Sequence, residues 1–151
     1  MNRKLLTTDY RLLTKRGFTL IELLVVISII GLLSSVGLAS FTRAQERARD
    51  AKRQSDLTSL RNSLEIYYSE NNAYVDTLGS WQNIDTSLDV LVPTYTKVLP
   101  ADPMKDQTYR YRSVTNQGYC LEAILEAATE PLQTTCTVSL ESGYNFGVGN
   151  P

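Results

Sequence analysis

The sequence predicts an α+β protein in which one long N-terminal helix packs on a small antiparallel sheet of about three strands. The helix is predicted because residues 19–69 lack proline and place apolar residues at helical spacing. The sheet is predicted because later segments alternate apolar and polar residues between turn signals. Hydrophobic residues make up 42% of the 151-residue chain and charged residues 21%, an ordinary globular balance apart from one apolar block.

That block, residues 18–41, is long enough to cross a membrane. As an α-helix it would be roughly 36 Å long, which exceeds the ~30 Å hydrocarbon core of a bilayer. Glu22 is its only charged residue. A charge in hydrocarbon costs at least ~2.5–3.5 kcal/mol, so a carboxylate at this position indicates a function.

Two simpler interpretations explain only part of this N-terminus. A secretory signal peptide would account for the basic residues before the block, but the apolar core is too long for one. A plain transmembrane anchor would account for the length. It would not account for Glu22 or for the Gly17-Phe18 junction at the start of the block.

Residues 42–72 are expected to continue the helix as an amphipathic segment that ends near Asn71-Asn72. The apolar stripe that should face the sheet consists of Leu57, Leu60, Leu64 and Tyr67. Residues 43–53 carry five basic and two acidic side chains. This basic run is interpreted either as a solvated helix face or as a contact with anionic lipid head groups.

Residues 73–151 are expected to form a globular α+β head. A short helix is predicted at Thr86–Val92, and prolines then interrupt regular structure. Residues 141–151 are expected to close the domain loosely. The strands are predicted at Tyr109–Val114, Tyr119–Glu126 and Leu132–Leu140.

Cys120 and Cys136 suit one disulfide in an oxidising compartment. If the second and third strands pair around Ala128, the two cysteines are directly opposed, about 4.5–5.5 Å apart at Cα. Closing such a loop would contribute roughly 3 kcal/mol. The alternative is two reduced, buried cysteines.

The composition also limits the chemistry. The chain has no histidine, which removes Ser-His-Asp triads and imidazole zinc sites, and it has no nucleotide-binding loop. Residues 54–151 hold five basic and twelve acidic residues, which argues against direct binding of nucleic acid. Glu141 is the single carboxylate of its late loop, too few for a calcium site. We therefore expect no enzyme, no metal and no cofactor.

The segment Lys15–Val26 resembles the class III signal of type IV pilins and type II secretion pseudopilins. The resemblance continues along Ala48–Leu57 and Tyr67-Tyr68. The element Leu99–Pro103, followed by Tyr109–Tyr111, is similar to the connector of major pseudopilins. This resemblance implies a pilin-like fold whose long helix spans the membrane in its first half.

The resemblance also implies roles for three residues. Residues 1–17 would be a leader that a prepilin peptidase removes after Gly17 on the cytoplasmic side. Phe18 would become the N-terminus and be N-methylated by the same enzyme. Glu22 would be the assembly carboxylate, paired with the Phe18 ammonium of a neighbouring subunit.

The function expected first is that of a structural subunit of a type IV pilus, and the alternative is a pseudopilin of a type II secretion or DNA-uptake system. Asp102-Pro103 favours the pseudopilin, whereas the late cysteine pair favours the pilin. A membrane-anchored binding module remains as a different class. The expected partners are further copies in a filament, the peptidase, an inner-membrane assembly platform with its ATPase, and membrane lipid before assembly. The precursor would cross the inner membrane once, with its N-terminus inside, and the filament would be periplasmic or extracellular.

Overall fold

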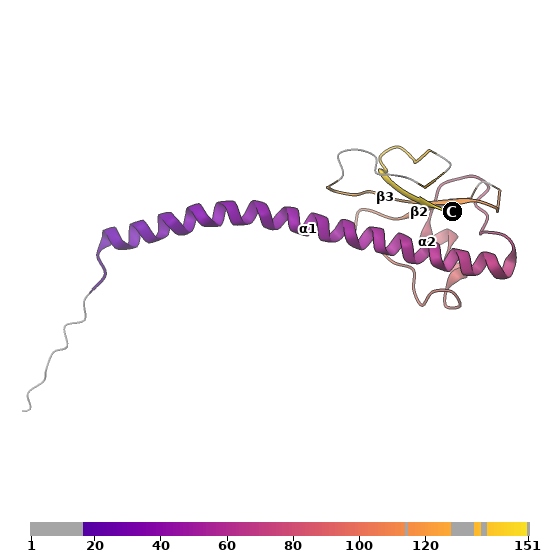
Figure 1. Cartoon of the computed structure of the whole chain (residues 1–151), viewed down its shortest axis with the longest axis horizontal. Coiled ribbons are helices and arrows are strands. Elements are labelled where there is room, and N and C mark those ends of the chain that lie inside the picture. Colours follow the sequence, from indigo (N-terminus) through magenta and orange to yellow (C-terminus); the bar gives the residue numbers. More distant parts are fainter. Residues whose placement is uncertain (1–16, 114, 128–134, 137–138, 151) are drawn as a thin grey trace, which may run out of the picture. The chain divides into compact units, whose positions relative to one another are not determined.

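The computed structural model describes residues 17–113, 115–127, 135–136 and 139–150 (Figure 1). It confirms the α+β class, with one long helix and one antiparallel sheet. The predicted leader, apart from Gly17, lies outside the described residues. In chain order the elements are α1 (Leu20–Asn71), β1 (Gln82–Asn83), α2 (Ile84–Ser87), the 3-10 helix η1 (Asp89–Leu91), β2 (Arg110–Ser113), β3 (Tyr119–Ala123) and β4 (Phe146–Gly149).

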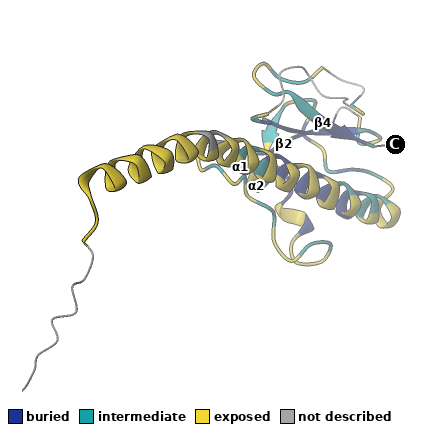
Figure 2. Ribbon diagram, turned by 60° about the vertical axis from the view of Figure 1, so that its left-hand side comes forward, coloured by how far each residue is buried: buried dark blue, intermediate teal, exposed yellow. Residues whose placement is uncertain are grey.

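Helix α1 passes through two compact units, one ending at Ala39 and one beginning at Ser40. In the first unit the described side chains of the helix are exposed, and in the second one face of the helix is buried (Figure 2). The helix stops where Asn72 adopts a φ of 55° and donates its N–H to the Tyr68 carbonyl at 2.8 Å. Asparagine tolerates this left-handed conformation, so the predicted helix end is explained.

The sheet has four strands in the order β1-β2-β3-β4, and each neighbouring pair is antiparallel. Tyr111 of β2 lies opposite Leu121 of β3, which in turn lies opposite Val148 of β4. These three side chains therefore share one face. Figure 1 shows the sheet beside the C-terminal part of α1. The shared face packs into one core with the stripe of α1 formed by Leu57, Leu60 and Leu64.

The opposite face of β3 is also covered. Cys120 and Glu122 point to this face and are both fully buried. Cys120 forms a disulfide with Cys136, with a Cα–Cα distance of 5.3 Å. Glu141 donates its backbone N–H to the Glu122 carboxylate at 3.0 Å. The segment around Cys136 and Glu141 thus lies over the outer face of the sheet.

The prediction of a third strand at Leu132–Leu140 is wrong for the part of it that the structure describes. Thr135, Cys136, Ser139 and Leu140 have no strand structure. The partner of β3 is β4, which lies in the segment that was expected to close the domain loosely. Cys136 is therefore near Cys120 as predicted, although it does not lie on a paired strand.

The glycines of β4 explain this difference. A Cβ on Gly147 would lie 2.6 Å from Leu140 Cδ2 and 2.9 Å from Cys136 Sγ. Only glycine at position 147 leaves room for Cys136 and Leu140 to pack directly against β4. Because glycine has low strand propensity, the same residues that make the contact possible hide β4 from sequence patterns.

The connector after α1 also differs from its prediction. It adds β1, a strand of two residues at the sheet edge. In place of one helix at Thr86–Val92 it forms α2, which begins two residues earlier, and then η1. Ile84 and Leu91 from these short helices are buried in the core, so tertiary packing decides where they begin and end.

Candidate functional site

The predicted processing site lies at the start of α1. Gly17 and Phe18 precede the helix and are exposed, Phe18 by 83%. Glu22 is in the first turn, and its Oε2 accepts hydrogen bonds from Thr19 N–H at 2.8 Å and from Thr19 Oγ1 at 2.7 Å. The backbone N–H of Glu22 donates to Thr19 Oγ1 at 3.3 Å. These reciprocal bonds form a capping box.

The capping box adds Thr19 to the residues predicted from the sequence. The pattern Thr-x-x-Glu before an apolar run is a helix-start signal in its own right, so Thr19 could have been found. Thr19 supplies the hydrogen bonds of the Glu22 carboxylate near the N-terminal start of the apolar segment. Glu22 is also the polar member of a shallow apolar hollow of about 340 Å³ lined by Phe18, Ile21, Glu22, Val25 and Val26.

The first part of α1 is apolar on every side, and its described side chains are exposed. Its best 18-residue window has a mean hydropathy of 2.4, and none of that window is buried. The hydroxyls of Ser28 and Ser35 donate to the carbonyls of Leu24 and Leu32, each at 2.8 Å. The helix is thus long and apolar enough to cross a membrane, with these hydroxyls satisfied by its own backbone.

A second cluster of charged side chains joins α1 to the head. Arg53 is fully buried, and it donates to the Asp102 carboxylate at 2.9 and 3.0 Å. It also donates to Asp50 at 2.7 Å and to Glu126 at 2.7 Å. Arg49 donates to the two oxygens of Glu126 at 2.7 and 2.5 Å. The Arg53 guanidinium therefore joins the helix to the connector and to the segment that follows β3.

The cluster also provides acceptors for two backbone N–H groups and shifts the pKa values of Glu126 and Arg49. Asp50 accepts the backbone N–H groups of Glu126 and Ala127, both at 2.9 Å. Hydrogen bonds from Arg49 and then Arg53 lower the pKa of Glu126 to about 2. The same carboxylate raises the pKa of Arg49. Glu126 and Arg49 are therefore both charged at neutral pH, as their ion pair requires.

This cluster corrects the interpretation of the basic run 43–53. Arg49 and Arg53 pair with Glu126 and Asp102 of the head, so these two are committed to the fold rather than to solvent or lipid. The Lys52 side chain is 59% exposed and pairs with Asp56 one turn further along α1. Arg43 and Arg47 are exposed and form no ion pair or hydrogen bond among the described residues.

Glu122 is a further titrating group that sequence patterns did not single out. Burial raises its pKa to about 7, against the opposing pull of Arg110 and Arg112. One of its oxygens, Oε1, is buried without a hydrogen-bond partner. Among the described residues, no group of three or more His, Cys, Asp or Glu side chains is placed to hold a metal ion.

Comparison with known proteins gives three kinds of result. Residues 13–38 match the family described as the prokaryotic N-terminal methylation motif. The type II secretion system core protein G of Vibrio cholerae serotype O1 is 33% identical over 115 residues, which cover 68% of this chain and 73% of that protein. No solved structure matches the chain.

Two further relatives set the range of the similarity. The type II secretion system core protein G of Escherichia coli (strain K12) is 36% identical over 96 residues, covering 59% of this chain. This chain spans 66% of the length of that protein. The type IV major pilin protein PilA of Myxococcus xanthus is 36% identical over 61 residues, but only 28% of its length is covered.

Proposed function

We infer the function from one premise: the chain belongs to the family of the type II secretion system core protein G, within the pilins and pseudopilins. We propose that it is a pseudopilin, a structural subunit that polymerises into a filament of a type II secretion system. The observation that carries this proposal is the extent of the similarity. It covers 73% of the V. cholerae core protein G but 28% of the pilin PilA.

This proposal reverses the order expected from the sequence, which put a type IV pilus subunit first. That order rested on the cysteine pair near the C-terminus, which is a feature of the head alone. The connector element with Asp102-Pro103 pointed to the pseudopilin. Asp102 has a structural reason to be there, because it forms the two hydrogen bonds to the buried Arg53.

The chain has four proposed parts. Residues 1–17 are a leader, and a prepilin peptidase cleaves after Gly17. Residues 18–41 are the membrane and assembly helix, residues 42–72 continue it into the head, and residues 73–151 are the head domain. The precursor sits in the inner membrane with its N-terminus inside, and an assembly platform with its ATPase extracts it into a periplasmic filament.

Glu22 is the proposed assembly residue. Among the described residues its carboxylate has only Thr19 as a hydrogen-bond partner, and in the membrane hydrocarbon would surround it. Cleavage after Gly17 creates an ammonium on Phe18, and the same group on a neighbouring subunit would neutralise the carboxylate. Because leaving one member of a buried pair unpaired costs about 3–5 kcal/mol, the pairing favours a single register between subunits.

The test is a Glu22→Ala variant of the full chain in cells that carry the secretion machinery. Intact-mass spectrometry of the membrane fraction and of filaments released from the periplasm should show a mature chain that begins at methylated Phe18. The variant should be cleaved normally but be missing from the released filaments. Ser28→Ala is the matched control, because it removes another polar group of the same helix without touching a proposed contact. Normal filaments from the Glu22 variant would refute the assembly role, and an uncleaved chain would refute the family mechanism.

A further inference from the structure

The ion pairs of the head leave two cations of the run 43–53 without a carboxylate partner among the described residues. Arg43 and Arg47 are exposed and have no ion pair among the described residues, whereas the other three cations of the run are paired. Residues four apart lie on the same face of a helix. Arg43 and Arg47 therefore present two neighbouring positive charges just beyond the apolar segment.

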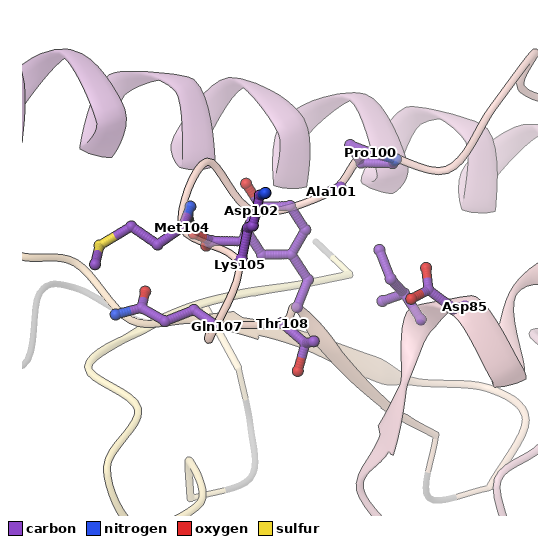
Figure 3. Close-up of a pocket in the computed structure, with 10 residues that line it drawn as sticks. Asp85, Pro100, Ala101, Asp102, Met104, Lys105, Gln107 and Thr108 are labelled. Atoms are coloured by element: carbon purple, nitrogen blue, oxygen red, sulfur yellow. Dashed lines mark hydrogen bonds between the residues drawn. The ribbon is translucent and has the colours of Figure 1, made fainter.

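A pocket of about 250 Å³ opens between α2 and the loop that follows Leu99. Its apolar wall includes Ile84, Pro100 and Tyr109. Figure 3 shows Asp85 on α2 at one side of the pocket, with Lys105 and Asp102 on the loop opposite it. Because pockets for drug-sized ligands are about 300–1,000 Å³, this one is better suited to a single side chain.

The charge around the pocket is the opposite of that on the helix. Residues 76–106 contain five acidic and two basic residues, a net charge of −3, while residues 43–53 have a net charge of +3. Asp102 is already paired with Arg53, but Asp85 has no ion pair among the described residues. An apolar wall with one free carboxylate suits a side chain that has a long aliphatic stem and a cationic end.

We propose that the Arg47 side chain of one copy enters this pocket on a second copy in the filament. Its stem packs on Ile84 and Tyr109, and its guanidinium pairs with Asp85. Arg43 on the same helix face adds to the attraction. The inference rests on the proposed polymerisation, because it names one contact between the copies.

The arrangement of the two surfaces suits a filament. The donor side chain is on α1, and the pocket is formed by α2 and the following loop, so the two surfaces are different patches of one chain. A contact between different patches repeats from copy to copy and generates an open helical assembly when the rotation does not close. Anionic lipid, the other ligand considered for the basic run, offers no role for Asp85 or the pocket.

The test is a charge swap in the full chain, expressed with its secretion machinery. Arg47→Glu and Asp85→Arg should each lower the yield of filaments released from the periplasm about tenfold or more, because each places like charges together. The double variant restores the opposite pair in reversed order and should recover most of the yield. Lys105→Gln removes the cation opposite Asp85 and should raise the yield. Asp85→Asn provides a milder variant if Asp85→Arg impairs folding, and it should also lower the yield.

The controls separate this contact from the polymerisation itself. Gln54→Glu and Thr115→Arg change charge by the same sign at exposed positions outside the two patches and should keep wild-type yields. Wild-type yields from both single swaps, or no recovery in the double variant, would overturn the contact and leave the proposed function intact. Loss of yield and of binding to phosphatidylglycerol vesicles in Arg47→Glu alone, with Asp85→Arg normal, would overturn it in favour of lipid. A cleaved wild-type chain that forms no filament would instead contradict the proposed function.

Discussion

The first and second halves of α1 are one continuous helix in opposite surroundings. In residues 20–39 the described side chains are exposed, including large apolar ones such as Leu32 at 69%. In the second half Leu57 and Leu64 are fully buried. Arg53 donates four hydrogen bonds there, two to Asp102, one to Glu126 and one to Asp50. Continuity of a helix therefore says little about what stabilises each part of it.

The comparison separates two kinds of mutational effect. Changes in the second half alter the folding of the head, because its side chains already have their partners within the chain. Changes in the first half should leave the folding of the head unchanged, because the described side chains there are exposed. Under the proposed function they should instead alter contacts with lipid or with other copies. The following predictions test this division by the free energy of unfolding of the full chain in detergent, from the largest expected effect to the smallest.

Arg53→Ala should lower the free energy of unfolding of the head by about 3–5 kcal/mol, since it leaves the Asp102 and Asp50 carboxylates without their main cation. Urea unfolding followed by the head signal measures the loss. Gln54→Ala, the next residue and exposed, should change it little. Equal stability of the two variants would mean that the buried cluster is not what joins α1 to the head.

Leu60→Ala should lower the free energy of unfolding by about 2–5 kcal/mol, because Leu60 is 1% exposed in the core and its removal leaves a cavity. Leu32→Ala is the matched change in the first half, where the side chain is 69% exposed. It should leave head unfolding unchanged. A comparable loss in both variants would contradict the division of the helix into two parts.

Removing the disulfide with the Cys120→Ala and Cys136→Ala pair should lower the free energy of unfolding by about 2–4 kcal/mol, given a sequence separation of 16. Treating the wild-type chain with dithiothreitol should produce a similar loss, and the double variant should be insensitive to the reductant. Sensitivity that persists in the double variant would point to an origin other than this bond.

The stability of the head should fall as pH rises from about 4.5 to 7. The folded pKa of Glu122 is raised to about 7, so the folded state binds this proton more tightly than the unfolded chain in that range. Glu122→Gln should remove roughly 1–3 kcal/mol of this fall. The measurement is urea unfolding at several pH values, with Gln54→Ala as an exposed, non-titrating control that keeps the wild-type slope.

The sequence predicted most of α1 and the two strands whose patterns are regular. Leu57, Leu60 and Leu64 repeat at helical spacing, and Tyr111 and Leu121 lie in alternating segments, so local patterns were sufficient. It could not predict β4, whose Gly147 is required by a contact with Cys136 and Leu140 from elsewhere in the chain. That requirement is tertiary and leaves no periodic signal.

The residues of the candidate site also fall into those that the sequence could predict and those that it could not. Gly17, Phe18 and Glu22 lie in one contiguous motif, so the sequence alone named them, and their roles stay predictions. The pairing of Arg53 with Asp102 and Glu126 joins residues 49 and 73 positions apart. A run of basic residues does not reveal which of its members have distant partners, so Arg49 and Arg53 were interpreted as surface charges.

The single tryptophan of the chain is in the head, where Arg112 lies over the Trp81 ring at 5.8 Å from its centroid. Its fluorescence therefore comes from the head and none of it from residues 20–39. Unfolding of the outer face of the sheet should change that emission, whereas insertion of the apolar helix into detergent or lipid should not. The protein thus carries an intrinsic optical reporter that follows one of its two regions without any label.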